Sequence, residues 1–245
     1  MNLLRTAARL FTLRLLLHQL ALAAIVAALC VAWLRVPDGR VLDVAASAFL
    51  AVILIVVTYA GETRLLLRIA SRPRTAGVVT RGSIALLLAT VVGTLCSLLL
   101  DRLGGGDKLR AGYVNSQLPA SLRNLLSYPH LLTLQHETWA WLFWIVFLLL
   151  AMAVAAITVA DRPRHAFARA VASTPLWLAL SAAVFAVAWP TTTLPYWLPR
   201  HQHTLAFETT SLILRLLAVT LIDAALLTYS LCLLAAHAQQ ADATQ

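Results

Sequence analysis

Residues 15–33 read LLLHQLALAAIVAALCVAW, and no side chain in this stretch carries a permanent charge. The hydrocarbon core of a bilayer is roughly 30 Å thick, and about 20 apolar residues in a helix cross it. In lipid, backbone N–H and C=O groups must bond within their own segment, which favours a helix. The stretch therefore predicts a membrane-spanning helix, and this decides the class of fold.

Five more stretches of this kind follow it. The six predicted spans are residues 15–34, 41–60, 83–100, 139–160, 171–189 and 212–236. Charged residues make up 12% of the chain, about half the share found in soluble domains. The sequence therefore predicts an all-α polytopic membrane protein. We expect a bundle of six transmembrane helices with short interfacial helices, in a single membrane domain over residues 1–245.

The distribution of basic residues predicts the orientation in the membrane. If the N-terminus is cytoplasmic, the segments on that side hold eleven arginines and the segments outside hold seven basic residues. An excess of Lys and Arg marks the cytoplasmic side. We therefore expect a bacterial cytoplasmic (inner) membrane protein with both termini inside. The formal net charge of +9 then comes from basic residues in the short segments between spans. We therefore expect the lipid bilayer as a partner and do not expect nucleic acid.

Asp223 is the most informative polar residue, because it lies near the middle of the sixth predicted span. An ionised carboxylate there costs at least about 2.5–3.5 kcal/mol, so Asp223 should face protein or be protonated. Thr220 is a nearby polar group, whereas Arg215 lies two turns away on a different face. Asp223 could serve as a proton or cation site, or as a hydrogen-bonded packing residue. The sequence favours packing, because no relay of ionisable groups accompanies Asp223.

The third predicted span carries a row of small residues spaced four apart, which are Ala85, Ala89, Gly93 and Ser97. Small residues let helices approach closely in lipid, where packing drives their association. We therefore expect this span to lie in the interior of the bundle.

Histidines supply the only candidates for metal or haem ligands. On the predicted outer side these are His136, His201 and His203, and imidazole suits zinc, copper and iron. His201 and His203 lack the four-residue spacing of a helical metal pair. Haem would need axial ligands at suitable depths, which the inner histidines (His18, His165 and His237) do not provide. The sequence identifies no cofactor, and a metal- or haem-binding membrane protein remains an alternative.

Motifs of membrane enzymes are absent from the sequence. It contains no phosphate-binding loop, no Gly-x-Ser-x-Gly and no His-Glu-x-x-His, so no catalytic residue can be named and a non-enzyme is expected. The favoured hypothesis is a non-catalytic integral membrane subunit that scaffolds or docks within a larger membrane complex. Its partners would be other membrane protein subunits.

The alternative is a transporter. The chain combines an amphipathic N-terminal stretch, six spans with both ends inside, a basic loop over residues 62–81 and a proline-rich outer turn before the last span. This layout resembles the permeases of ABC-2-type exporters. The resemblance implies that loop 62–81 docks a cytoplasmic ATPase. The candidate docking residues are then Arg64, Arg68, Arg72 and Arg74. The long outer loop 101–138 departs from that layout.

Overall fold

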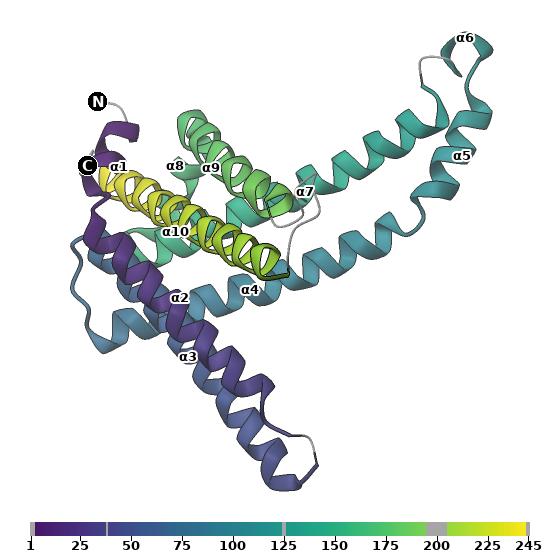
Figure 1. Cartoon of the computed structure of the whole chain (residues 1–245). Coiled ribbons are helices and arrows are strands. Elements are labelled where there is room, and N and C mark those ends of the chain that lie inside the picture. The colour runs from purple at the N-terminus through teal and green to yellow at the C-terminus, as the bar shows by residue number, and fades with distance from the viewer. Residues whose placement is uncertain (1–2, 38, 124–125, 195–204, 244–245) are drawn as a thin grey trace. The chain divides into compact units, whose positions relative to one another are not determined.

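The computed structural model of the chain describes residues 3–37, 39–123, 126–194 and 205–243. Within these ranges the chain forms ten α-helices and no strand (Figure 1). The helices are α1 (Leu3–Leu10), α2 (Leu13–Leu34), α3 (Val41–Ile69), α4 (Ala76–Gly104), α5 (Asp107–Gln117), α6 (Ala120–Arg123), α7 (Tyr128–Val159), α8 (Pro163–Ala172), α9 (Thr174–Thr193) and α10 (Leu205–Ala243).

Six of these helices, α2, α3, α4, α7, α9 and α10, are long and apolar enough to cross a membrane. The prediction of an all-α polytopic membrane protein is therefore confirmed. The helix boundaries differ from those predicted: α7 begins at Tyr128 instead of residue 139, and the predicted loop 62–81 shrinks to residues 70–75. Helix α3 continues to Ile69 because its last turns bury Leu65, Leu66 and Leu67. Tertiary packing therefore extends a helix that hydropathy alone would end near residue 60.

Backbone hydrogen bonds explain why α3 stops where it does. The Arg72 N–H donates to the Leu67 carbonyl at 2.9 Å, and the Ser71 N–H donates to the Arg68 carbonyl at 3.2 Å. This pair of bonds is a Schellman motif, which needs a left-handed residue just after the helix. Ser71 takes that conformation, with φ of 53°. Pro73 follows and prevents the helix from resuming at once.

Replacing Ser71 by glycine is expected to stabilise the protein by roughly 1 kcal/mol, because an L-residue with a Cβ is strained in the left-handed region. The measurement is the free energy of unfolding in detergent. Ser71→Ala is the matched control, since it removes the hydroxyl but keeps the Cβ. The prediction fails if the glycine variant is no more stable than the alanine variant.

The described residues group into two compact units, and the single domain expected over residues 1–245 stays a prediction. Unit 1 comprises Met1–Leu86 and Met152–Gln245, and unit 2 comprises Leu87–Ala151. In unit 1, α10 is the central helix, because it contacts α1, α2, α3, α8 and α9. Its second half buries a continuous run from Cys232 to Ala236. Three of its five side chains are small, and a second buried cluster consists of Ala156, Ala160 and Ala166, so helix backbones can approach closely at both places.

Unit 2 is held by a buried carboxylate at the start of α5. The Trp139 indole donates from Nε1 to Asp107 Oδ2 at 2.8 Å. Arg110 lies 3.8 Å from the other carboxylate oxygen, and its guanidinium carbon is 5.8 Å from the centre of the Trp139 ring. Asp107 also lies in the first turn of α5, where the helix dipole favours negative charge. Much of the predicted outer loop 101–138 is therefore folded into α5, α6 and the start of α7.

Candidate functional site

Between residues 209 and 236, helix α10 carries two side chains of the Asp, Glu, Lys and Arg types, Arg215 and Asp223. Eight residues separate them, which is about 12 Å along a helix and about 80° around it. They therefore do not form a pair along α10. Each must be considered with its own surroundings.

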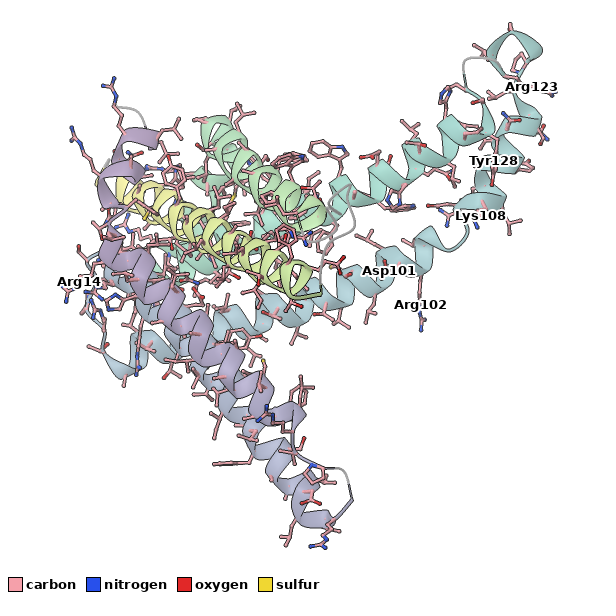
Figure 2. All side chains as sticks on the ribbon, viewed as in Figure 1. Arg14, Asp101, Arg102, Lys108, Arg123 and Tyr128 are labelled. Carbon is pink, nitrogen blue, oxygen red and sulfur yellow. The ribbon has the colours of Figure 1, made fainter. Side chains whose placement is uncertain are left out.

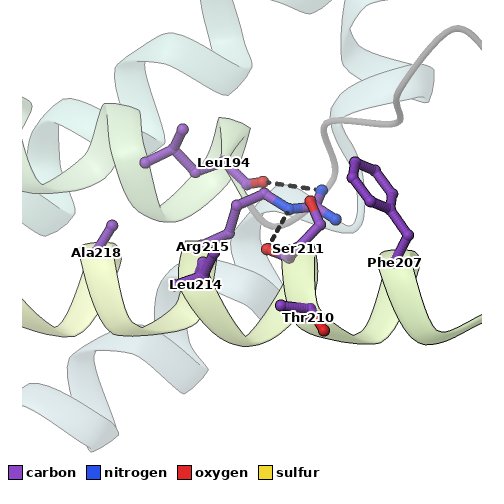
Figure 3. Close-up of a pocket in the computed structure, with 7 residues that line it drawn as sticks. All are labelled: Leu194, Phe207, Thr210, Ser211, Leu214, Arg215 and Ala218. Atoms are coloured by element: carbon purple, nitrogen blue, oxygen red, sulfur yellow. Dashed lines mark hydrogen bonds between the residues drawn. The ribbon is translucent and has the colours of Figure 1, made fainter.

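Arg215 turns toward the end of α9 (Figure 3). Its Nε donates to the Ser211 carbonyl at 3.1 Å, and its Nη1 donates to the Leu194 carbonyl at 3.5 Å. Leu194 is the C-terminal cap of α9, where unpaired carbonyls carry partial negative charge. The guanidinium thus satisfies a helix end, which explains a cation at this position without any ligand.

An open groove of about 320 Å³ lies beside Arg215. Its other lining residues are Leu194, Phe207, Thr210, Ser211, Leu214 and Ala218. The lining is mostly apolar, and the one charged group in it already contacts two carbonyls. This arrangement contains no pair of acid and base or nucleophile and base, so it suggests no reaction.

Asp223 lies midway between Phe207 and Gln240, the ends of the apolar part of α10. Its side chain is half-buried, and its Oδ1 is shielded from solvent without a hydrogen-bond partner in the described part of the chain. The nearby threonine hydroxyls bond within their own helix instead. Thr220 donates to the Leu216 carbonyl at 2.8 Å, and Thr228 donates to the Ala224 carbonyl at 2.7 Å. Nothing in unit 1 that the structure describes therefore pairs with Asp223 Oδ1.

A second polar site, which the sequence reasoning missed, joins α2 to α3. Gln19 is 4% exposed, and its Nε2 donates to Glu62 Oε1 at 2.7 Å. The Gln19 Oε1 atom is shielded and has no partner among the described residues. A signal was available, because His18 and Gln19 interrupt the apolar run 15–33. Glu62 belongs to the predicted loop 62–81, so the sequence does not predict its hydrogen bond to a side chain within a span.

Helices α3, α4 and α7 meet most closely at Gly82. A Cβ atom there would lie 2.5 Å from Thr63 Cγ2 and 3.0 Å from Thr158 Cγ2. Both threonines are buried, with 3% and 2% of their surface exposed. The Ser83 hydroxyl lies 3.5 Å from the Thr63 hydroxyl and donates to the Val79 carbonyl. We call this contact of three helices the Gly82 junction; a Cβ at Gly61 would lie as close, 2.5 Å from Leu22 Cδ1, but there only α2 and α3 meet.

The predicted row of small residues on α4 is less confined. Ala85 is buried, and Ala89, Gly93 and Ser97 are partly exposed. A Cβ at Gly93 would lie 3.5 Å from Leu150 Cδ1, an ordinary van der Waals contact. A packing role for this row stays a prediction.

The four candidate docking arginines do not share one loop. Arg64 and Arg68 belong to α3, and Arg72 and Arg74 lie in the connection 70–75. Arg72 forms a bidentate pair with Asp161, with both N–O distances at 3.1 Å. Arg68 bonds to the His18 ring, whereas Arg64 and Arg74 are exposed. A docking role stays a prediction.

The candidate metal ligands are only partly described. His136 is exposed on α7, and His201 and His203 lie outside the described residues. Within the described ranges no three metal-ligating side chains gather. Of the inner histidines, His18 has both ring nitrogens engaged, whereas the His237 Nε2 is shielded and has no described partner.

Comparison with protein-family models, with curated proteins and with solved structures finds no match to this chain.

Proposed function

We propose that this protein is a non-catalytic integral membrane subunit that docks within a larger membrane complex. The observation that supports it is the Asp223 carboxylate, which lies at the middle of the α10 span with a shielded, unpartnered oxygen in the described chain. A charged carboxylate at that depth costs at least about 2.5–3.5 kcal/mol unless a polar group meets it. Polar side chains of this kind join helices across an interface within the membrane. A donor on a second polypeptide would supply what the described part of this chain lacks.

The rest of the chain agrees with this role. Its intramembrane ionisable groups are few, and Arg215 contacts carbonyls at the end of α9. A proton path through the membrane would need a chain of such groups. Asp223 therefore suits a contact between subunits better than a transport step.

The test is site-specific photo-crosslinking in cells. A photo-reactive residue at Leu227, exposed and one turn from Asp223 on the same face, should capture a membrane protein partner. Asp223→Leu should reduce this crosslink at least tenfold, because it removes the polar contact. Asp223→Asn can still form hydrogen bonds and should retain most of it. The control is Thr220→Val, since that hydroxyl bonds only to its own helix.

Two results would overturn the proposal. One is an equally strong crosslink in the Asp223→Leu variant. The other is an Asp223→Asn variant that crosslinks normally but loses a measured transport activity, because that result would make Asp223 a proton carrier.

We infer that the protein lies in a bacterial cytoplasmic membrane with both termini on the cytoplasmic side. The basic-residue excess supports this orientation. Helix α1 contacts α10, and the Phe11 and Tyr229 ring centroids are 6.4 Å apart, so the first and last described helices pack together. A cysteine at Gly105 should react with an impermeant thiol reagent in intact cells, whereas one at Ala76 should not. The reverse labelling would invert every side assignment.

A further inference from the structure

Three arginines gather at one end of the α2–α3 pair. Arg14 lies in the first turn of α2, Arg68 in the last turn of α3, and Arg74 in the connection 70–75. The charges of Arg14 and Arg74 act on the Arg68 guanidinium. Figure 2 shows Arg14 at this end of α2, among other nitrogen-bearing side chains. We call these three residues the arginine cluster.

The arginine cluster has no carboxylate partner within the described residues. The acids of neighbouring segments are engaged elsewhere, because Glu62 accepts from Gln19 and Asp161 binds Arg72. The first turn of α2 also contains no acidic residue. Repulsion among the three guanidinium groups is therefore uncompensated by the described chain.

His18 links Arg68 of α3 to the first turns of α2, next to Arg14. Its Nδ1 bonds to the Arg14 carbonyl, and its Nε2 bonds to Arg68 Nη1. A guanidinium only donates, so Arg68 is the donor in its bond to the His18 ring. His18 takes one of the five N–H groups of Arg68, and the others stay available for a ligand.

We propose that the arginine cluster binds the phosphate of an anionic phospholipid. Guanidinium groups match phosphate oxygens in charge and in bidentate geometry. The arginine cluster lies at the end of two helices long enough to span the bilayer, where headgroups lie. Leu13 and Leu17 flank Arg14 and are 70% and 56% exposed, so acyl chains can lie against α2 beside the bound headgroup. This proposal does not depend on Asp223.

The experiment is native mass spectrometry of the full chain in mild detergent, titrated with phosphatidylglycerol or phosphatidylcholine. We expect at least a tenfold preference for phosphatidylglycerol, because each arginine near an anionic surface contributes about fivefold. Arg14→Gln, Arg68→Gln and Arg74→Gln together should abolish the preference. The control triple, Arg35→Gln, Arg40→Gln and Arg102→Gln, removes the same charge from exposed positions and should keep it.

Arg74→Gln alone tests the proposal if the triple variant does not fold, because Arg74 is exposed on a connection and lacks a described partner. It should lower phosphatidylglycerol binding about fivefold. Several results would overturn the proposal. These are equal loss in the control triple, unchanged binding in the arginine variants, and displacement of the lipid by equimolar inorganic phosphate. A fourth is an arginine variant that binds lipid as the unmodified protein does but no longer binds an acidic protein partner.

Discussion

Replacing Gly82 by alanine is expected to destabilise the protein by about 1–3 kcal/mol, the usual cost of overpacking a tight interior. The added Cβ would lie 2.5 Å from Thr63 Cγ2, closer than two carbon atoms can approach without movement. The obstacle is a short β-branched side chain, which has little rotamer freedom within a helix. The Gly82 junction must therefore open, separating α4 from α3 or α7. The measurement is the free energy of unfolding in detergent.

Two variants serve as controls for the Gly82 prediction. Gly93→Ala adds the same atom on the same helix at an ordinary distance of 3.5 Å from Leu150, so it should be neutral or slightly stabilising. Thr63→Ser removes only the methyl group that Gly82→Ala would strike, and should recover part of the loss in the double variant. The explanation fails if Gly82→Ala and Gly93→Ala behave alike, or if Thr63→Ser brings no recovery.

Replacing Gln19 by leucine is expected to lower the free energy of unfolding by about 2–3 kcal/mol. The change removes the buried amide donor and leaves the half-buried Glu62 carboxyl group without its hydrogen bond. The Gln19 amide is the described hydrogen-bond partner of Glu62, at 2.7 Å. Glu62→Gln should have a small effect by comparison, since an amide oxygen can accept the same bond. Both free energies come from unfolding in detergent.

A double-mutant cycle separates this pairing from simple packing. Replacing both partners by apolar residues leaves no unpaired polar group, so Gln19→Leu with Glu62→Met should be more stable than the sum of the single variants by at least about 1 kcal/mol. Additive losses would mean that the two side chains contribute independently, and the hydrogen bond would then contribute little to stability.

Local sequence was sufficient for the membrane-spanning helices. An apolar run of about 20 residues must be helical in lipid whatever surrounds it, so the run 15–33 and its five counterparts could be recognised one at a time. The approximate positions of Asp223 and Arg215 within the last span followed in the same way. The contact of Arg215 with the Leu194 carbonyl could not be predicted from local sequence, because Leu194 lies at the end of a different helix.

The ends of the helices and the polar contacts depended on tertiary packing. Helix α3 continues past residue 60 because Leu65, Leu66 and Leu67 are buried by other parts of unit 1. Gln19 meets Glu62 across 43 positions of sequence, a contact with no local pattern.

The same reason applies to the glycines. Gly93 stood out in the sequence because small residues recur every four positions around it, yet Gly82 is the position where three helices come closest. Hydropathy thus determined which segments can cross the membrane, and residue spacing determined which helix faces carry small side chains. Only the tertiary structure decided which faces meet, because close approach depends on the side chains of helices that are distant in the chain.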